Sequence, residues 1–177
     1  MIAKAPRRVI VASFSSHVHR VQQVLDAAHA NGRRVALLGR SMVRNMTIAA
    51  DLGYLKVPDN VLIDYKKAKD LPEDKIVYMS TGSQGEPMAV LSRMANLDHA
   101  IEPGEGDTVI LASSLIPGNE SAVYRVIDGL TKLGANVVHK ATPGCTFRVT
   151  LRPESCCIAT TSSSPRMSFR CTANTAT

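Results

Sequence analysis

The chain has 177 residues, of which 45% are hydrophobic and 20% are charged, and this balance is typical of one globular domain. It contains neither a long apolar run of membrane-spanning type nor a recognisable cleavable leader, so we expect no membrane partner and a cytoplasmic location. The net charge of +6 permits an anionic partner without requiring one, and three Phe, four Tyr and no Trp leave few platforms for stacking bases. Composition by itself identifies no function.

Short apolar runs rich in β-branched residues alternate with helical periodicities as far as residue 140. We expect strands at residues 8–13, 35–38, 75–79 and 108–112, with a last one starting at Val137. Strands that are separated by helices predict a parallel sheet covered on both faces. The expected fold class is therefore α/β, a parallel sheet flanked by helices, formed by residues 1–140.

Four helices are expected between these strands. The first follows Ser16 and ends at Gly32, and the second runs from about residue 41 to residue 53. The third lies behind Pro87 with Met88 on its apolar face, and the fourth follows Asn119, a candidate N-cap. Residues 54–74 are less regular and rich in lysine, and we expect a solvated connection there.

The last 37 residues have a different composition. Residues 141–177 contain 13 Ser or Thr and all four cysteines of the chain (Cys145, Cys156, Cys157 and Cys171), without a sustained period. No Cys-x-x-Cys pair occurs, so the cysteines indicate neither a zinc site nor a disulfide framework. We expect this tail to be disordered or irregular.

Polar loops follow four of the expected strands, and the carboxyl ends of parallel strands share one edge, where ligands tend to bind. The longest loop, residues 79–87, combines two glycines with Ser80, Thr81 and Ser83 ahead of a helix, which suits a phosphate cradle. An ordinary tight turn between strand and helix explains the same residues equally well. The loop matches neither the Walker pattern nor Gly-x-Gly-x-x-Gly.

The loop after the first strand carries His17, His19 and Arg20. The two histidines are two positions apart and would not share a helical face, so we do not expect them to bind a metal as a pair. His17 and Arg20 could contact a phosphate group. Polar residues at the exposed entry of a helix are the alternative.

Four segments resemble bacterial ribonuclease J, of the β-CASP branch of the metallo-β-lactamase superfamily. They are VIVASFSSHVHRVQQVLDAA, GRSMVRNM, MSTGSQGEPMAVLSRMA and VILASSLIPGNESAVYRVIDGLTKLGANVVHK, and they cover about residues 7–140. The resemblance implies that these residues form the β-CASP domain. In that family the domain helps to clamp RNA over a two-zinc site in the neighbouring metallo-β-lactamase domain.

The resemblance also shows what this sequence lacks. It contains no His-x-His-x-Asp-His signature, and after VVHK it has neither the Ser-Gly-His-Ala nor the Pro-Val-His-Gly-Glu motif of the family. Metal-assisted hydrolysis needs a bound ion to acidify its water. We therefore expect this chain to bind no zinc, to lack catalytic residues and to be inactive alone, with zinc belonging to the full-length enzyme.

A reading-frame shift would explain the tail. With the codon frame displaced and degenerate bases chosen freely, residues 144–151 can be read as Val-His-Val-Ser-Gly-His-Ala. Residues 169–175 can be read in the same way as Pro-Val-His-Gly-Glu-Tyr. Both motifs return in family order, so we hypothesise that residues 141–177 are a frameshift product.

The favoured function is that of a ribonuclease J fragment, with an RNA-contacting surface and single-stranded RNA as partner through the full enzyme. A face left without its partner domain would also favour self-association as a homo-oligomer. The alternatives are a small α/β module that binds a nucleotide or a protein, and a non-functional product of a disrupted gene. The candidate RNA or phosphate contacts are His17, His19, Arg20, Arg40, Ser80, Thr81, Ser83, Gln84 and Ser114.

Overall fold

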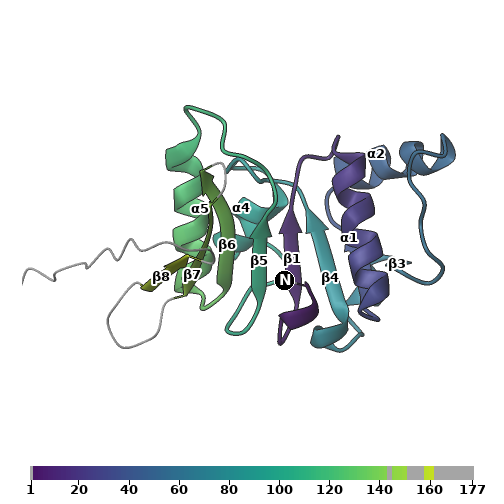
Figure 1. Cartoon of the computed structure of the whole chain (residues 1–177), viewed down its shortest axis with the longest axis horizontal. Coiled ribbons are helices and arrows are strands. Elements are labelled where there is room, and N and C mark those ends of the chain that lie inside the picture. The colour runs from purple at the N-terminus through teal and green to yellow at the C-terminus, as the bar shows by residue number, and fades with distance from the viewer. Residues whose placement is uncertain (1, 143–144, 151–157, 162–177) are drawn as a thin grey trace, which may run out of the picture.

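A computed structural model describes residues 2–142, 145–150 and 158–161. Their central feature is one eight-stranded sheet in the order β3-β2-β4-β1-β5-β6-β7-β8 (Figure 1). The first six strands in sequence are mutually parallel, which confirms the predicted α/β class. Their bounds are β1 Val9–Ala12, β2 Arg34–Leu37, β3 Leu62–Ile63, β4 Ile76–Ser80, β5 Thr108–Leu111 and β6 Asn136–Thr142.

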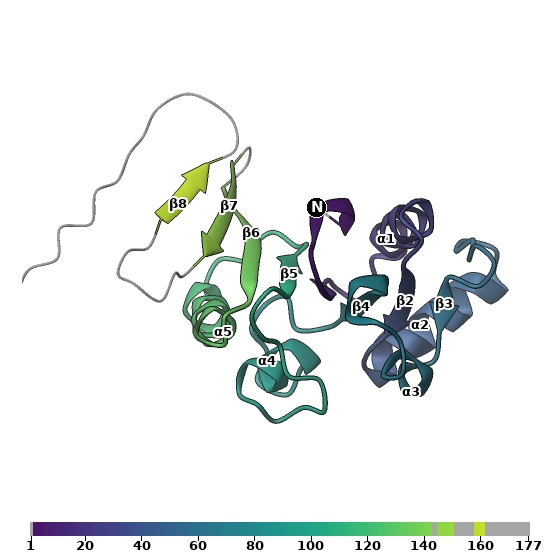
Figure 2. The same ribbon diagram turned by 90° about the horizontal axis from the view of Figure 1, so that it is seen from below.

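Helices cover both faces of the sheet. They are α1 Val18–Ala30, α2 Arg40–Asp51, α3 Tyr65–Ala68, α4 Val90–Ala95 and α5 Glu120–Lys132, with 3-10 turns η1 Ile2–Lys4 and η2 Glu73–Lys75. One apolar core joins α1 and α2 to one face of the strands, and a second joins α3, α4 and α5 to the other face. Figure 2 shows α1 on one side of the sheet and α4 and α5 on the other.

The central strands are short because each needs only four or five residues to span this core. All four residues of β1 and all five of β4 are buried, since alternate side chains enter opposite helical layers. Val9 pairs with Val77 of β4 on one side and with Thr108 of β5 on the other. This register brings the carboxyl ends of β1, β4 and β5 level with one another.

The expectation for residues 54–74 is wrong in part. The lysines there are exposed, but Leu55, Val61 and Ala68 are buried, and the segment contains β3, α3 and η2. The Asp64 side chain caps α3 by accepting a hydrogen bond from the Lys66 N–H at 3.2 Å. These apolar residues are too widely spaced to show a helical or strand periodicity in the sequence, although each contacts the core.

The helix expected behind Pro87 begins later than predicted. It starts at Val90, and Met88 is 88% exposed instead of lying on the buried face. The chain first makes a turn, in which the Ala89 N–H donates to the Glu86 carbonyl at 3.1 Å. Asn119 does precede α5, but its side chain makes no capping hydrogen bond.

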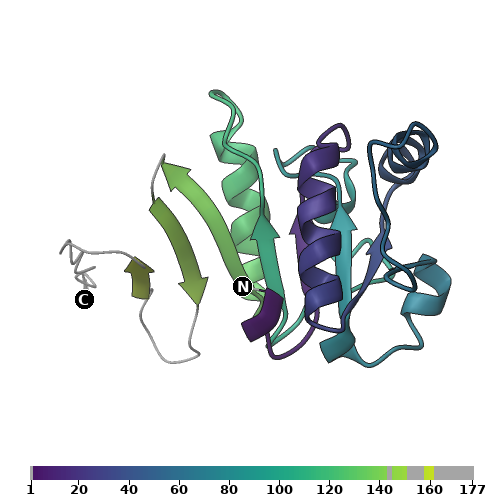
Figure 3. The same cartoon turned by 45° about the vertical axis from the view of Figure 1, so that its right-hand side comes forward.

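Part of the tail is more regular than expected. Cys145–Thr150 forms β7, antiparallel to β6, and Ile158–Thr161 forms β8, antiparallel to β7 (Figure 3). Both segments are rich in Thr, Val, Ile and Phe, which favour strands, and the exposed edge of β6 offers a backbone ladder. The prediction of irregular structure is therefore wrong for these residues. Its remainder lies outside the described residues, and the frameshift stays a hypothesis.

Candidate functional site

The carboxyl edge of the parallel sheet gathers the polar loops, as the sequence predicts. Backbone hydrogen bonds continue past the strand ends, from the Ser13 N–H to the Ser80 carbonyl at 3.0 Å and from the Ala112 N–H to the Ala12 carbonyl at 2.9 Å. The loops after β1, β4 and β5 consequently leave the sheet side by side. Two hollows open near this edge, one at the start of α1 and one at the start of α2.

The first hollow has a volume of about 480 Å³ and lies at the start of α1. It contains three of the predicted contact residues, which the fold brings together with an aromatic side chain from a distant loop. Its lining residues are Ser16, His17, Val18, His19, Arg20, Gln23 and Tyr54.

His17 and His19 line the same hollow, although helical spacing predicted that they would not share a face. The reason is that His17 is the N-cap of α1, with φ −85° and ψ 72°, and so lies outside the helix. Its ring meets the Phe14 ring edge to face, with centroids 5.5 Å apart. Both histidines are exposed, and Arg20 pairs with no carboxylate within the described residues.

Tyr54 is the residue of this hollow that sequence reasoning missed. It is 74% exposed and follows α2, yet it lies beside the start of α1. Gln22 of α1 holds this loop, because its amide donates to the Lys56 carbonyl at 2.8 Å and accepts from the Lys56 N–H at 2.7 Å. The only signal in the sequence was a Tyr just after the helix-ending Gly53, in a chain with few aromatic residues.

The second hollow, of about 460 Å³, lies at the start of α2. Among the predicted contacts it contains only Arg40, which is exposed. The fold adds a second arginine from the same helix, a tyrosine from α3 and a histidine from the loop after α4, all of which the sequence analysis missed. Its lining residues are Leu37, Leu38, Gly39, Arg40, Val43, Arg44, Tyr65 and His99.

Helix α2 lines the second hollow and is joined to the loop after β1, whose residues Ser16 and His17 line the first hollow. The Asn45 side-chain amide donates to the Ser15 carbonyl and hydroxyl oxygens, both at 3.2 Å, and so fixes α2 to the loop after β1. Arg40 and Arg44 lie on another face of the helix, toward the second hollow.

Residues 79–85, at the end of β4 and in the loop after it, are buried or half-buried, whereas Glu86 and Pro87 are exposed. Gln84 is only 3% exposed, and its amide donates to the Ser113 hydroxyl at 3.2 Å and the Ser114 carbonyl at 2.8 Å. Its side-chain oxygen accepts from the Ile116 N–H at 3.0 Å. Gln84 thereby joins the loop after β4 to the loop after β5, a positioning role that its sequence context did not reveal.

Close packing explains the glycines of this loop. Gly85 has φ +74°, and a Cβ there would come within 2.5 Å of the backbone of α5 at Ala122. The N–H of Gly85 bonds to the Gly82 carbonyl at 3.2 Å, and the N–H of Gln84 bonds to the Glu86 carboxylate at 3.2 Å. These amides are therefore already used, which favours the tight-turn explanation over a phosphate cradle.

The remaining predicted contacts differ in exposure. Ser80 and Ser83 are buried, and their hydroxyls have no protein partner among the described residues. Thr81 is half-buried, with its carbonyl accepting from the Leu91 N–H at 3.2 Å, whereas Ser114 is exposed. Since buried hydroxyls normally find a partner, an ordered water at Ser80 and Ser83 fits this arrangement.

No three His, Cys, Asp or Glu side chains within residues 2–139 come together as metal ligands. The pair His17 and His19 lacks a third ligand of that kind in its hollow. A membrane-crossing helix, one long and apolar enough, is also not found in the described part of the chain.

Comparison with known proteins agrees with the family resemblance of the sequence. The β-CASP domain family of ribonuclease J matches residues 6–130. Ribonuclease J of Mycolicibacterium smegmatis is 58% identical over 142 residues, which are 80% of this chain and 25% of that protein. Ribonuclease J of Mycobacterium tuberculosis (strain H37Rv) is 55% identical over 142 residues, and that of Thermus thermophilus is 52% identical over 145 residues. Each of these matches also covers 80% of this chain and 25% of the relative. The chain thus spans about a quarter of the length of these relatives.

Proposed function

The chain belongs to the ribonuclease J family, whose β-CASP domain matches it over most of its length, and from this premise we propose that it binds single-stranded RNA at the first hollow. The observation that carries the proposal is the convergence of His17, His19, Arg20 and Tyr54 on one open surface. An arginine without a carboxylate partner among the described residues, next to two histidines and an aromatic ring, suits a flexible RNA strand that offers phosphates and unstacked bases.

Each side chain has a distinct task in this proposal. Arg20 binds a phosphate group, because its guanidinium has no carboxylate partner within the described residues. Tyr54 stacks on a base, and the Gln22–Lys56 bonds keep its loop in place. His17 and His19 donate hydrogen bonds to the sugar-phosphate backbone of the RNA.

The other predicted contacts are assigned by their exposure. Thr81, Ser114 and Arg40 remain accessible enough to contact an RNA strand that extends along the carboxyl edge of the sheet. Ser80, Ser83 and Gln84 are buried, so we propose that they support the loops and do not meet RNA directly.

We propose that RNA cleavage belongs to a larger enzyme of this family. There, a metallo-β-lactamase domain and its zinc ions would supply the hydrolytic chemistry in the cytoplasm, while the present residues hold the substrate. The chain alone would be inactive, because its sequence lacks the His-x-His-x-Asp-His signature. Without that domain, exposed apolar side chains such as Met88 and Ile116 would favour self-association.

The test is RNA binding by the full chain, followed by fluorescence anisotropy of a labelled strand of about ten nucleotides. Affinity should fall as salt rises from about 50 to 200 mM, by about 0.7 logarithmic units per phosphate contact for each tenfold increase in salt. Arg20→Ala should lower affinity roughly fivefold and reduce this slope by about one contact, since it removes one charged hydrogen bond.

Arg34→Ala is the matched control, because Arg34 is an exposed arginine at the opposite edge of the sheet. It should leave both affinity and slope unchanged. If the two variants behaved alike, or if binding did not depend on salt, RNA binding at the first hollow would be excluded.

A further inference from the structure

The turn between α1 and β2 contains a chemically labile pair. Asn31 is the only asparagine of the chain that is followed by a glycine, and both residues are exposed. Gly32 has φ +61°, and a Cβ built on it would meet no atom within 4 Å outside its chain neighbours. No side chain therefore crowds the backbone amide of Gly32, as one does after most asparagines. The pair has the sequence and the open space that loss of an asparagine side-chain amide requires.

The same turn closes the end of α1 as a Schellman motif. The Arg33 N–H donates to the Ala28 carbonyl at 2.9 Å, and the Gly32 N–H donates to the His29 carbonyl at 3.1 Å. Asn31 is the C-cap of the helix. The conformation of the helix end thus depends on the backbone length between the cap and these two N–H groups.

A further hydrogen bond holds the asparagine side chain. Its amide donates to the Ala27 carbonyl, one turn back along α1, at 2.6 Å. Since the Gly32 N–H is also bonded, both reacting groups are released only when the last helical turn frays. A helix end opens locally at a much smaller cost in free energy than the whole protein. The hydrogen bonds therefore slow a reaction of this pair without preventing it.

We propose that the Asn31–Gly32 turn is a site of spontaneous deamidation to isoaspartate and aspartate. The Gly32 nitrogen forms a bond to the side-chain carbonyl carbon of Asn31, and the bond from that carbon to the side-chain nitrogen breaks. The amide proton of Gly32 passes through water to the leaving nitrogen, which departs as ammonia. Water then opens the cyclic imide at either carbonyl. Water is the only co-reactant, and nothing is oxidised or reduced.

The product changes the end of α1 in two ways. A carboxylate at this position meets the negative end of the helix dipole and cannot donate to the Ala27 carbonyl, as the amide does. In isoaspartate the backbone also runs through the former side-chain carbon, which adds one atom between Asn31 and Gly32. The N–H groups of the Schellman motif are then displaced from their carbonyls.

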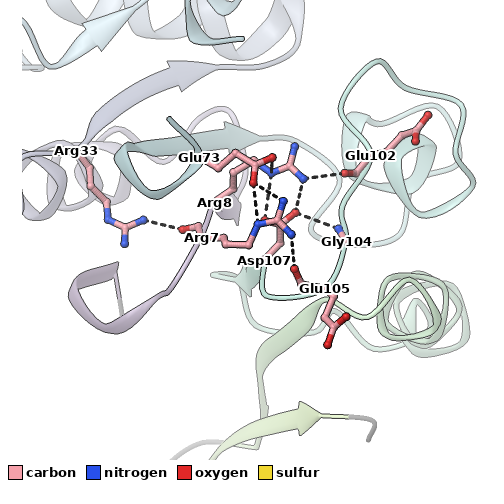
Figure 4. A network of polar contacts seen from close by, with 8 residues as sticks. All are labelled: Arg7, Arg8, Arg33, Glu73, Glu102, Gly104, Glu105 and Asp107. Atoms are coloured by element: carbon pink, nitrogen blue, oxygen red, sulfur yellow. Dashed lines mark hydrogen bonds and ion pairs between the residues drawn. The ribbon is translucent and has the colours of Figure 1, made fainter. Parts of the chain in front are cut away.

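Arg33 connects this turn to the amino edge of the sheet. Arg33 is only 8% exposed, and its guanidinium donates to the Ala5 carbonyl at 2.6 Å. It also donates to the Arg7 carbonyl at 2.9 Å (Figure 4). Ile2, in the same segment, packs against the apolar core that contains α1. Because a displaced Arg33 no longer reaches both carbonyls, isoaspartate formation should loosen residues 2–8.

The test is prolonged incubation of the full chain in mildly alkaline buffer, followed by ion-exchange chromatography and peptide mapping by mass spectrometry. Each deamidation lowers the net charge of +6 by one. Asn60 and Asn96 are internal controls, because both are exposed but precede a bulky side chain. Asn31 should convert several-fold faster than either, and faster still in urea, where the turn is open.

Two variants complete this experiment. Asn31→Gln should remove the early charge loss, because the longer side chain forms a cyclic imide much more slowly. Asn60→Gln is the matched control and should leave the charge loss unchanged. Circular dichroism checks that both variants fold.

Hydrogen exchange on the isolated isoaspartate form tests the link to the amino edge. Residues 2–8 and 28–34 should exchange several-fold faster than in the fresh chain, whereas β4 and β5 should not change. Asn31→Gln after the same incubation should keep the exchange pattern of the fresh chain.

Two results would overturn the inference. If Asn31 converted no faster than Asn60 in the folded chain, the hydrogen bonds of the helix end would block the reaction. If residues 2–8 of the isoaspartate form exchanged as in the fresh chain, the Arg33 contacts would survive the change and the link to the amino edge would be wrong. None of the proposed RNA contacts enters this inference, so a failure of RNA binding would leave it standing.

Discussion

Single residues at the carboxyl edge divide into those that face outward and those that hold the loops. His17, Arg20 and Tyr54 surround open space, whereas Gln84 is buried and fully engaged between two loops. Both kinds of residue have polar side chains in polar loops. Burial and existing hydrogen bonds therefore decide which of them can meet a ligand.

Tyr54→Ala tests the stacking role at this scale. Removing the ring should weaken single-stranded RNA binding by about 1–3 kcal/mol, the usual contribution of one stacked base. Tyr54→Phe should retain most of the affinity, because the ring face is preserved. Since Tyr54 is largely exposed, neither change should alter the melting temperature appreciably. Equal affinity of the Ala and Phe variants in the anisotropy assay would contradict base stacking at Tyr54.

At the scale of elements, the loops at the carboxyl edge act as one unit because side chains join them. Gln84 links the loop after β4 to that after β5, and Asn45 links α2 to the loop after β1. Gln22 does the same between α1 and the segment after α2. The loop that carries Tyr54, at the first hollow, is thus held by hydrogen bonds to another element.

Gln84→Ala should show the strength of one such link. The change leaves the Ile116 N–H and the Ser114 carbonyl without their buried partner, which should lower the free energy of unfolding by about 2–3 kcal/mol. Gln23→Ala, an exposed residue of α1, is the control and should change it by less than about 0.5 kcal/mol. Urea denaturation of both variants measures the difference. Similar midpoints for the two would show that the Gln84 bonds add no net stability.

For the molecule as a whole, a polar network closes the amino edge of the sheet, opposite the hollows (Figure 4). Arg8, before β1, donates to the Asp107 carboxylate at 3.1 and 2.7 Å, and Asp107, before β5, also accepts from the Gly104 N–H at 3.0 Å. Arg7 pairs with Glu73 and donates to the Glu105 carbonyl at 2.6 Å. The hydrogen bond from Arg7 holds the pKa of Glu73 below its ordinary value.

Two carboxylates that both contact Arg8 allow a matched comparison. Asp107 is fully buried, so Asp107→Ala should lower the free energy of unfolding by about 3 kcal/mol, because Arg8 and the Gly104 N–H lose a buried partner. The Glu73 side chain is 45% exposed, and Glu73→Ala should lower the free energy of unfolding by less than about 1 kcal/mol. Chemical denaturation of the full chain compares them. If the Glu73 variant were as unstable as the Asp107 variant, burial would not be the reason why one carboxylate stabilises the fold more than the other.

The sequence by itself determined the parallel α/β fold, because continuous apolar strands alternate with amphipathic helices and this order permits few topologies. It also determined that polar loops meet at one edge, and the family followed from segments such as STGSQGEP. Only the tertiary structure decided that Tyr54 joins His17 and Arg20, and that Arg44 joins His99. Tyr54 is far from His17 and Arg20 in the chain, as His99 is from Arg44, and their exposure depends on contacts that no local periodicity of the sequence encodes. For the same reason, the sequence could not distinguish the buried Gln84 from the accessible Ser114 in its neighbouring loop.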